Sequence, residues 1–201
     1  MATQTGNIIS GTIGDWVYSD NNGKQGIRAK PKKVSNPRTK SQQANRVTFG
    51  KTSQLSSYMK EALNIGLHWD SVRKQKRPYL LFRSYNSKCF TPDGEIDFPH
   101  VVVSRGTLKP VDITSAVIDG GVLTVTFNGR IYGGAAKDEF FLFVYCHDLT
   151  AGLLAPPVPR SSGIATLPLP EEWLSHPLHI YAFLRGYRLR TSNTLYIPLT
   201  E

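Results

Sequence analysis

The chain opens with a short alternating pattern that predicts a β-hairpin. In "GDWVYSD", Trp16 and Tyr18 alternate with smaller or polar residues, as in a strand with one covered face. The next stretch, "NNGKQG", contains Asn22-Gly23, a pair that tolerates positive φ and is typical of a tight turn. The return strand is expected to begin at "IRA" and to end before Pro31, which has no N–H to donate.

A helical pattern follows the hairpin. Apolar residues recur at spacings of three, four and their sums and form one stripe, which comprises Ala44, Val47, Leu55, Tyr58, Met59, Ala62 and Leu63. Thr39 is the expected N-cap, Gln42 is placed to complete a capping box, and Gly66 is expected to end the helix. Pro78 suits the first turn of a short helix through "YLLFRSYN", for which an extended conformation is the alternative.

From residue 100 onward the hydrophobic period changes to two. Seven candidate strands follow, at residues 100–106, 112–119, 122–128, 139–147, 163–169, 178–186 and 194–199. Short strands with regular turn signals predict a seven-stranded β-sandwich of immunoglobulin or fibronectin-III type. The likeness is one of architecture, because the Cys…Trp…Cys pattern of true immunoglobulin domains is absent.

This pattern predicts a mainly β protein with an α-helical N-terminal part. We expect a basic region with a hairpin and one or two helices at residues 1–99, and a β-sandwich domain at residues 100–201. Phe140 and Phe141 are adjacent in a strand and therefore point to opposite faces. One of them must cover a second surface, which is either the N-terminal helix or a partner.

Several segments together resemble an uncharacterised protein family. These are "GIRAKPKKVSNPRTKSQQANRVTF", the helix after it, "SYN" at 84–86 and "VVVSRGTL" at 101–108. They are similar to a domain-of-unknown-function family of proteins of similar length, found mainly in Bacteroidetes, with an N-terminal KP…NPRT…Q…R motif. The segment "WDSVRKQKRPYLLF" departs from the pattern, because it is more basic than expected. The resemblance implies a helix before a β-rich half and implies no activity.

The charge distribution adds a candidate binding region. Residues 1–90 carry 16 Lys and Arg against 4 Asp and Glu, whereas residues 91–201 carry 8 against 11. The candidate binding residues are the basic side chains Arg28, Lys30, Lys32, Lys33, Arg38, Lys40 and Arg46, with Trp16 and Tyr18 from the hairpin. The cations suit phosphate contacts and the aromatic rings suit base stacking. The alternative is that these cations are solvated or dock on acidic groups of a partner.

The sequence offers little for catalysis or metal binding. It contains no nucleophile elbow, P-loop or zinc motif, and His176 and His179 are separated by Pro177. Ser161 or Ser162 with the adjacent His147 and Asp148 makes a poor triad, since neighbouring strand residues diverge. The carboxylates that a glycosidase site could use are Asp138, Glu139, Glu171 and Glu172, in loop and turn contexts. We therefore expect no enzyme, cofactor or metal.

The leading hypothesis is a non-enzymatic binding or assembly module with a basic N-terminal arm, whose partner is a second copy or another protein. A nucleic-acid-associated protein is the alternative, and a carbohydrate-binding module, using exposed aromatic residues such as Trp173, is weaker. No signal peptide or membrane helix is evident, so we expect a cytoplasmic protein, or part of an assembly made in the cytoplasm. Cys89 and Cys146 are expected to be reduced thiols.

Overall fold

The structure is a computed structural model that describes residues 3–5, 8–21, 23–33, 38–91, 95–130 and 137–199. The chain divides into two compact units, Met1–Lys40 and Ser41–Glu201. This division differs from the change in secondary structure expected near residue 100, because the helices share a hydrophobic core with the strands that follow them. Among the described residues, no helix is long and apolar enough to cross a membrane.

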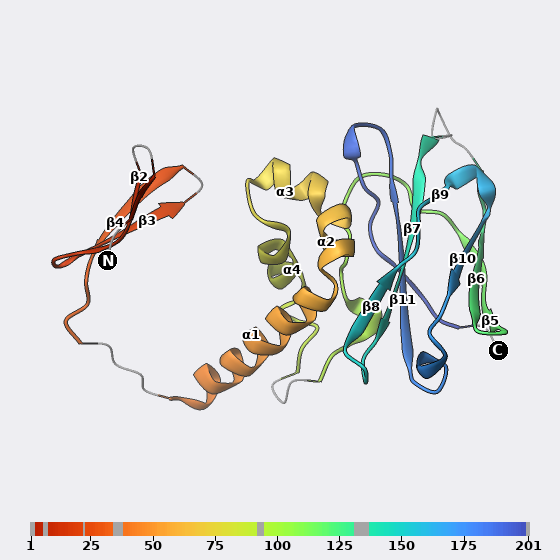
Figure 1. Ribbon diagram of the computed structural model, residues 1–201, viewed down its shortest axis with the longest axis horizontal. Helices are drawn as coiled ribbons and strands as arrows, with labels where there is room; N and C mark the ends of the chain where they lie inside the picture. Colours follow the sequence, from red (N-terminus) through yellow and green to blue (C-terminus); the bar gives the residue numbers. More distant parts are fainter. Residues whose placement is uncertain are drawn as a thin grey trace. The chain divides into compact units, whose positions relative to one another are not determined.

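The first unit contains a four-stranded antiparallel sheet in sequence order (Figure 1). Its strands are β1 (Thr3–Thr5), β2 (Ile8–Ile13), β3 (Trp16–Asn21) and β4 (Lys24–Ala29). The predicted hairpin is β3–β4, in which Asn21 pairs with Lys24 across a turn that includes Gly23 at φ +83°. Asn22 lies outside the described residues. Strands β1 and β2 were not predicted, because β1 has only three residues and the isoleucines of β2, Ile8, Ile9 and Ile13, do not alternate regularly with polar residues.

The second unit begins with four helices. They are α1 (Lys40–Tyr58), α2 (Lys60–Gly66), α3 (His68–Lys74) and α4 (Pro78–Asn86). The predicted helix start after Thr39 and its end at Gly66 are confirmed, as is the short helix that begins with Pro78. At Met59 the predicted helix bends rather than continuing straight, with φ −92° and ψ 8°. The predicted stripe is buried only from Leu55 onward, since the first half of α1 extends beyond the sheet.

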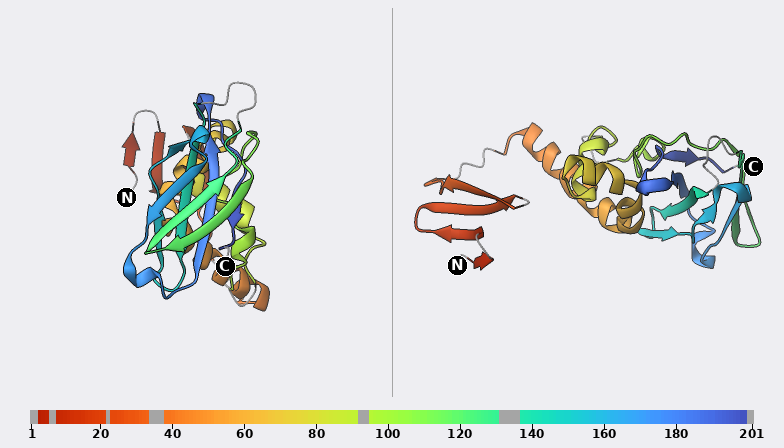
Figure 2. Two further views of the ribbon diagram at one scale, coloured as in Figure 1. Left: turned by 90° about the vertical axis from the view of Figure 1, so that its right-hand side faces the viewer. Right: turned by 90° about the horizontal axis from the view of Figure 1, so that it is seen from above.

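The strands of the second unit form two antiparallel sheets. The smaller has the order β10 (Ile164–Pro168), β6 (Val122–Phe127), β5 (Ile113–Asp119). The larger has the order β12 (Leu195–Ile197), β11 (Leu178–Arg185), β7 (Glu139–Cys146), β8 (Ala151–Leu154), and β9 (Val158–Pro159) also pairs with β7. Six of the seven predicted strands are present. The two sheets face each other across one hydrophobic core (Figures 1 and 2).

The central strands β7 and β11 are buried on both faces. Phe140, Leu142 and Val144 point into the core between the sheets, whereas Phe141 and Phe143 point toward the helices. The helix-side core is completed by residues that include Leu55, Met59, Leu63, Phe82, Tyr181 and Phe183. The second surface expected from Phe140 and Phe141 is therefore the helical layer, and the unit has three layers in the order helices, larger sheet, smaller sheet (Figure 1).

The prediction of a strand at residues 100–106 is wrong. Residues Phe98–His100 form a 3-10 turn, and the extended segment after it joins no sheet. Side chains satisfy its backbone instead. Asn86 accepts from the Val102 N–H at 2.7 Å and donates to the Val102 carbonyl at 3.0 Å, while Thr194 Oγ1 accepts from the N–H groups of Val103 and Ser104. These side chains occupy the positions that a neighbouring strand would supply.

Two glycines allow this segment to approach its neighbours closely. A Cβ on Gly66 would lie 2.7 Å from the Val103 carbonyl oxygen, and one on Gly106 would lie 1.8 Å from the Thr191 carbonyl oxygen. The buried Ser104 hydroxyl bridges these elements by donating toward the carbonyls of Gly66 at 2.9 Å and Ser192 at 2.7 Å. The "SYN" and "VSRG" motifs thus fasten the helices to the larger sheet.

Replacing Asn86 with Ala is expected to destabilise the protein strongly. The buried Asn86 amide serves three backbone groups of Phe82 and Val102, and its loss leaves the Val102 groups without this partner. We expect the free energy of unfolding, measured by urea denaturation, to fall by about 2–4 kcal/mol. Asn64→Ala, at an exposed position of α2, is the control and should change it by less than about 0.5 kcal/mol. Equal effects of the two substitutions would contradict the assigned role of Asn86.

Candidate binding surfaces

The predicted aromatic and basic residues of the hairpin lie on different faces of the N-terminal sheet. Trp16 pairs with Ala29, Tyr18 pairs with Ile27, and Arg28 pairs with Val17. Because side chains alternate along a strand, Arg28 points to the face opposite Trp16 and Tyr18. A phosphate held by Arg28 would therefore lie on the far side of the sheet from the rings expected to stack bases.

The remaining basic candidates are exposed and are divided between the two units. Lys30, Lys32 and Lys33 follow β4, and Arg38 and Lys40 precede or begin α1. Arg46 belongs to α1 in the second unit. Residues 34–37, within this run, lie outside the described residues. All of these candidates except Arg46 thus belong to the first unit.

One face of the N-terminal sheet is apolar and uncovered. Ile13, Trp16 and Ile27 are 48%, 52% and 58% exposed, and strand pairing places all three on the same face with Tyr18. Every side chain of β2, β3 and β4 for which burial is described is exposed or only half-buried. This sheet therefore has no hydrophobic core among its described residues.

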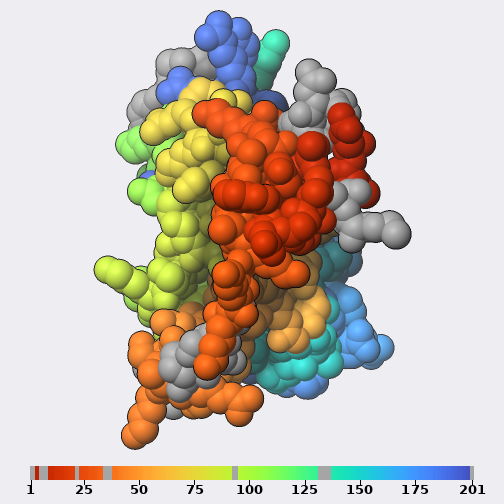
Figure 3. Space-filling view, turned by 90° about the vertical axis from the view of Figure 1, so that its left-hand side faces the viewer, coloured from red at the N-terminus to blue at the C-terminus, as the bar shows by residue number. Residues whose placement is uncertain are grey.

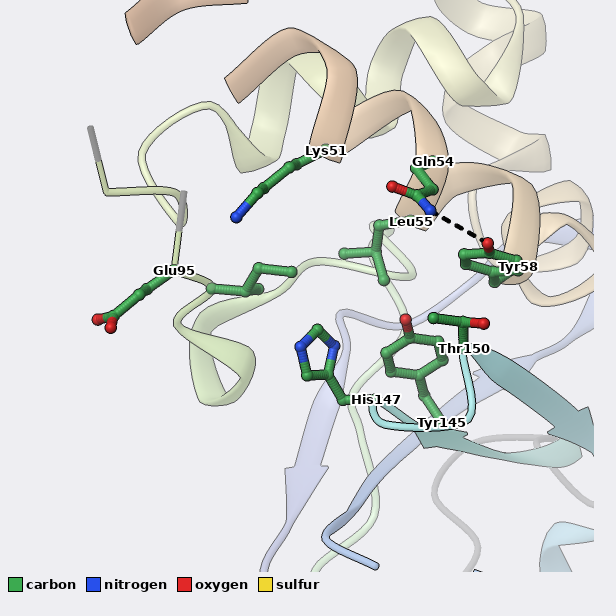
Figure 4. A pocket seen from close by; sticks show the side chains of 9 residues that line it. Lys51, Gln54, Leu55, Tyr58, Glu95, Tyr145, His147 and Thr150 are labelled. Carbon is green, nitrogen blue, oxygen red and sulfur yellow. Dashed lines mark hydrogen bonds between the residues drawn. The ribbon is translucent and has the colours of Figure 1, made fainter. Parts of the chain in front are cut away.

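The second unit has a pocket between α1 and the end of β7 (Figure 4). Its volume is about 230 Å³, and Leu55, Ile96 and Tyr145 form its apolar surface. Polar groups surround this surface: Lys51, Gln54, Tyr58, Glu95, His147 and Thr150. Lys51, Gln54 and Tyr58 follow each other at spacings of three and four on one face of α1, a signal that the sequence analysis did not use.

Hydrogen bonds and burial set the electrostatics of this pocket. Gln54 Nε2 donates to the Tyr58 hydroxyl at 3.2 Å, and the hydrogen bonds of Tyr58 with Gln54 and Thr150 lower its pKa. Burial, followed by the proximity of Tyr58, raises the pKa of Tyr145 to about 12. The Glu95 carboxylate points away from the His147 ring (Figure 4). The groups can hydrogen-bond a small polar molecule, and they do not form a paired acid and base.

Three of the carboxylates considered for catalysis are held by cationic or imidazole side chains. Asp138 forms a buried ion pair with Arg160, whose nitrogen lies 3.5 Å from its carboxylate, and Glu139 binds Arg185 at 2.7 Å. Asp148 binds His176 at 3.0 Å. Trp173, considered for sugar stacking, is only 4% exposed. Within the described ranges, no group of three or more His, Cys, Asp or Glu side chains is placed to hold a metal.

His179 lies in an aromatic cluster near the pocket. Its ring stacks on Phe98 with 3.7 Å between centroids, and its Nδ1 lies 3.3 Å from the Tyr196 hydroxyl. Burial, reinforced by the nearby His147, lowers the pKa of His179 to about 4. The folded protein therefore favours the neutral imidazole, which packs as an aromatic ring.

This lowered pKa predicts a loss of stability in mild acid. The unfolded chain binds a proton at His179 near its ordinary pKa of 6.5, whereas the folded chain binds it only near pH 4. Stability from this residue is thus complete above about pH 6.5 and is lost as the pH falls toward 4. The shift corresponds to about 3 kcal/mol, and solvent screening of the half-exposed ring reduces the expected loss to roughly 2 kcal/mol. In urea denaturation across this range, His179→Phe should show a shallower decline than the parent. His176→Gln, at the half-buried neighbouring histidine, is the control, and a parent-like decline in His179→Phe would contradict the assignment.

Comparison with known proteins gives a family match over nearly the whole chain. Residues 8–198 match the family described as "Family of unknown function (DUF6266)". No curated protein and no solved structure matches the chain. The match begins at β2 and includes the helices and both sheets of the second unit, so the chain belongs to the DUF6266 family of unknown function.

Proposed function

We propose that the protein is a non-enzymatic assembly module that associates with a second copy of itself through the apolar face of its N-terminal sheet. The observation that carries this proposal is the absence of any buried side chain in β2–β4, at the positions whose burial is described, on a sheet that displays Ile13, Trp16 and Ile27. Such a sheet gains little stability from its own contacts. Small units of about 40 residues or fewer usually need a disulfide, a metal or a partner chain.

The distribution of charge on this sheet favours self-association. The apolar face holds Trp16, Tyr18 and Ile27, whereas Arg28 projects from the opposite face with Val17. Two copies that stack their apolar faces about 10 Å apart therefore keep these arginines away from each other. A two-fold pairing of this kind uses the same surface on both chains.

The size of the face sets the expected affinity. Strands of six residues are about 20 Å long, and strands are spaced by about 4.8 Å. Stacking two such faces buries roughly 600–800 Å² in total, which is small for a stable complex. We therefore expect a concentration-dependent dimer with micromolar affinity.

We also propose that the two sheets of the second unit form a sandwich of immunoglobulin or fibronectin-III type. Strands β5, β6 and β10 lie in one sheet, while β7, β8, β11 and β12 lie in the other. Strands β5 and β6, the first two of the unit, thus lie in the sheet opposite β7, β11 and β12, as in those sandwiches. Domains of this architecture commonly serve as binding modules, which agrees with a non-enzymatic role without a cofactor.

Removing the apolar face is expected to abolish the dimer. For the full-length chain, sedimentation equilibrium should show a monomer–dimer equilibrium, and Trp16→Ala with Ile27→Ala should weaken it by at least about tenfold. Thr12→Ala with Val17→Ala is the control, because both residues lie on the opposite face. The two cores of the second unit contain none of these residues, so far-UV circular dichroism should show that the variants fold. A parent chain that stays monomeric at all concentrations would refute the proposal.

A further inference from the structure

One end of the second unit brings together arginines and aromatic rings from four separate segments. The segments are α3, α4, the loop at residue 105, and the turn between β11 and β12, which contains a 3-10 helix, η5 (Tyr187–Leu189). The turn stands beside α3 in two views (Figures 1 and 2), and its blue atoms project beyond α3 at the top of Figure 3. This surface lies entirely within the second unit and includes none of the predicted candidate residues.

Contacts between these segments orient the guanidinium groups. Arg190 lies over the Trp69 ring at 6.0 Å and donates to Thr107 Oγ1 from Nε at 3.3 Å and from Nη2 at 3.0 Å. Arg105 lies over the Tyr85 ring at 4.5 Å. Planar guanidiniums held against rings are oriented before a ligand arrives, which reduces the entropy lost on binding.

The one buried carboxylate in this region is already neutralised. Asp70 accepts from Tyr85 and from Lys74, whose ammonium also lies over the Tyr85 ring at 4.9 Å. Burial opposes ionisation of Asp70, but these hydrogen bonds outweigh it and lower its pKa. Lys74 therefore balances Asp70, and the nearby arginines keep their charge.

Among the described residues, four arginines in this region form no salt bridge, and only Arg73 acts on an acidic group, because its charge helps to lower the pKa of Asp70. Arg73, Arg105, Arg188 and Arg190 are exposed, and none of them forms a salt bridge with a carboxylate of the described residues. By contrast, Arg160 and Arg185 of the same unit are paired with Asp138 and Glu139. The surface is thus a local cluster of positive charge with few acidic groups to balance it.

The β11–β12 turn holds its side chains outward at a conformational cost. Arg188 and Leu189 have φ values of 56° and 58°, a region that residues other than glycine rarely occupy. The turn is closed by the Gly186 N–H, which donates to the Arg190 carbonyl at 2.8 Å. As a result Tyr187 is 79% exposed, with Arg188 over its ring at 5.2 Å.

We propose that this surface, formed by Arg73, Arg105, Tyr187, Arg188 and Arg190, binds single-stranded nucleic acid. One guanidinium can donate two parallel hydrogen bonds to the oxygens of a phosphate. An exposed tyrosine ring offers a surface on which a base can stack. The combination of unpaired arginines with an exposed ring distinguishes this ligand from an acidic protein, which needs the charges alone. The surface also places cation and ring on one side, which the N-terminal sheet does not.

The test is a salt series of binding to a fluorescent oligothymidylate of about 20 nucleotides, starting near 50 mM salt. Four phosphate contacts predict a slope of about −3 in log K against log salt concentration, and Arg105→Ala with Arg190→Ala should reduce its magnitude by about 1.4. Lys32→Ala with Lys33→Ala removes the same charge from the N-terminal arm and should leave the slope unchanged. Tyr187→Ala should weaken binding at least about fivefold, with Tyr79→Ala, an exposed tyrosine on α4, as its control.

A separate variant distinguishes binding from folding. Arg188→Gly removes one cation and suits the left-handed backbone, so its unfolding temperature should be unchanged or higher while its affinity falls. The proposal is overturned if the parent does not bind at low salt, or if the arm variant loses as much affinity as the arginine variant. It is also overturned if polyglutamate displaces the oligonucleotide at equal charge concentration and Tyr187→Ala has no effect, because the surface would then recognise an acidic protein.

Discussion

The structure depends on the pairing of β7 with β11 and on the burial of both faces of that pair. The two strands align over eight residue pairs, from Leu178 with Cys146 to Arg185 with Glu139. Phe140, Leu142 and Val144 belong to the core between the sheets, and Phe141 and Phe143 belong to the core under the helices. A slip of one residue would exchange the two sets, so both cores specify the same register.

Two-sided burial also explains the polar motifs at the edge of the helical layer. Chain segments that join covering helices to a sheet have buried backbone groups that need hydrogen-bond partners other than a neighbouring strand. Asn86 and Thr194 provide those partners for residues 102–104, and the Ser104 hydroxyl serves the carbonyls of Gly66 and Ser192. Gly66 and Gly106 provide the space. The residues of "SYN" and "VSRG" thus join the layers, and the inferred binding surface lies beside this junction.

Function is expected at surfaces rather than in a deep site. The N-terminal sheet exposes Ile13, Trp16 and Ile27, and the β11–β12 turn of the second unit exposes Tyr187 beside arginines that form no salt bridge with the described carboxylates. The two surfaces suit different partners, because one is apolar and the other is cationic. Together they are consistent with a component that assembles with copies of itself and contacts a nucleic acid strand. Neither role requires the buried carboxylate of Asp138, which forms an ion pair with Arg160.

The sequence by itself determined the elements whose signals are local. Turn chemistry and period-two patterns predicted the β3–β4 hairpin and six strands, and Thr39, Gly66 and Pro78 marked helix ends, because each depends on nearby residues only. The strand expected at residues 100–106 was wrong because its apolar pattern serves packing, while its hydrogen bonds go to Asn86 and Thr194, far away in sequence. The candidate cations were chosen by their density along the chain, and this criterion left out Arg105 and Arg190. It also grouped Arg28 with Trp16, although the two side chains lie on opposite faces of the sheet. Only the tertiary structure decided which charges share a surface, since that depends on contacts between segments more than 80 residues apart, such as Arg190 with Thr107.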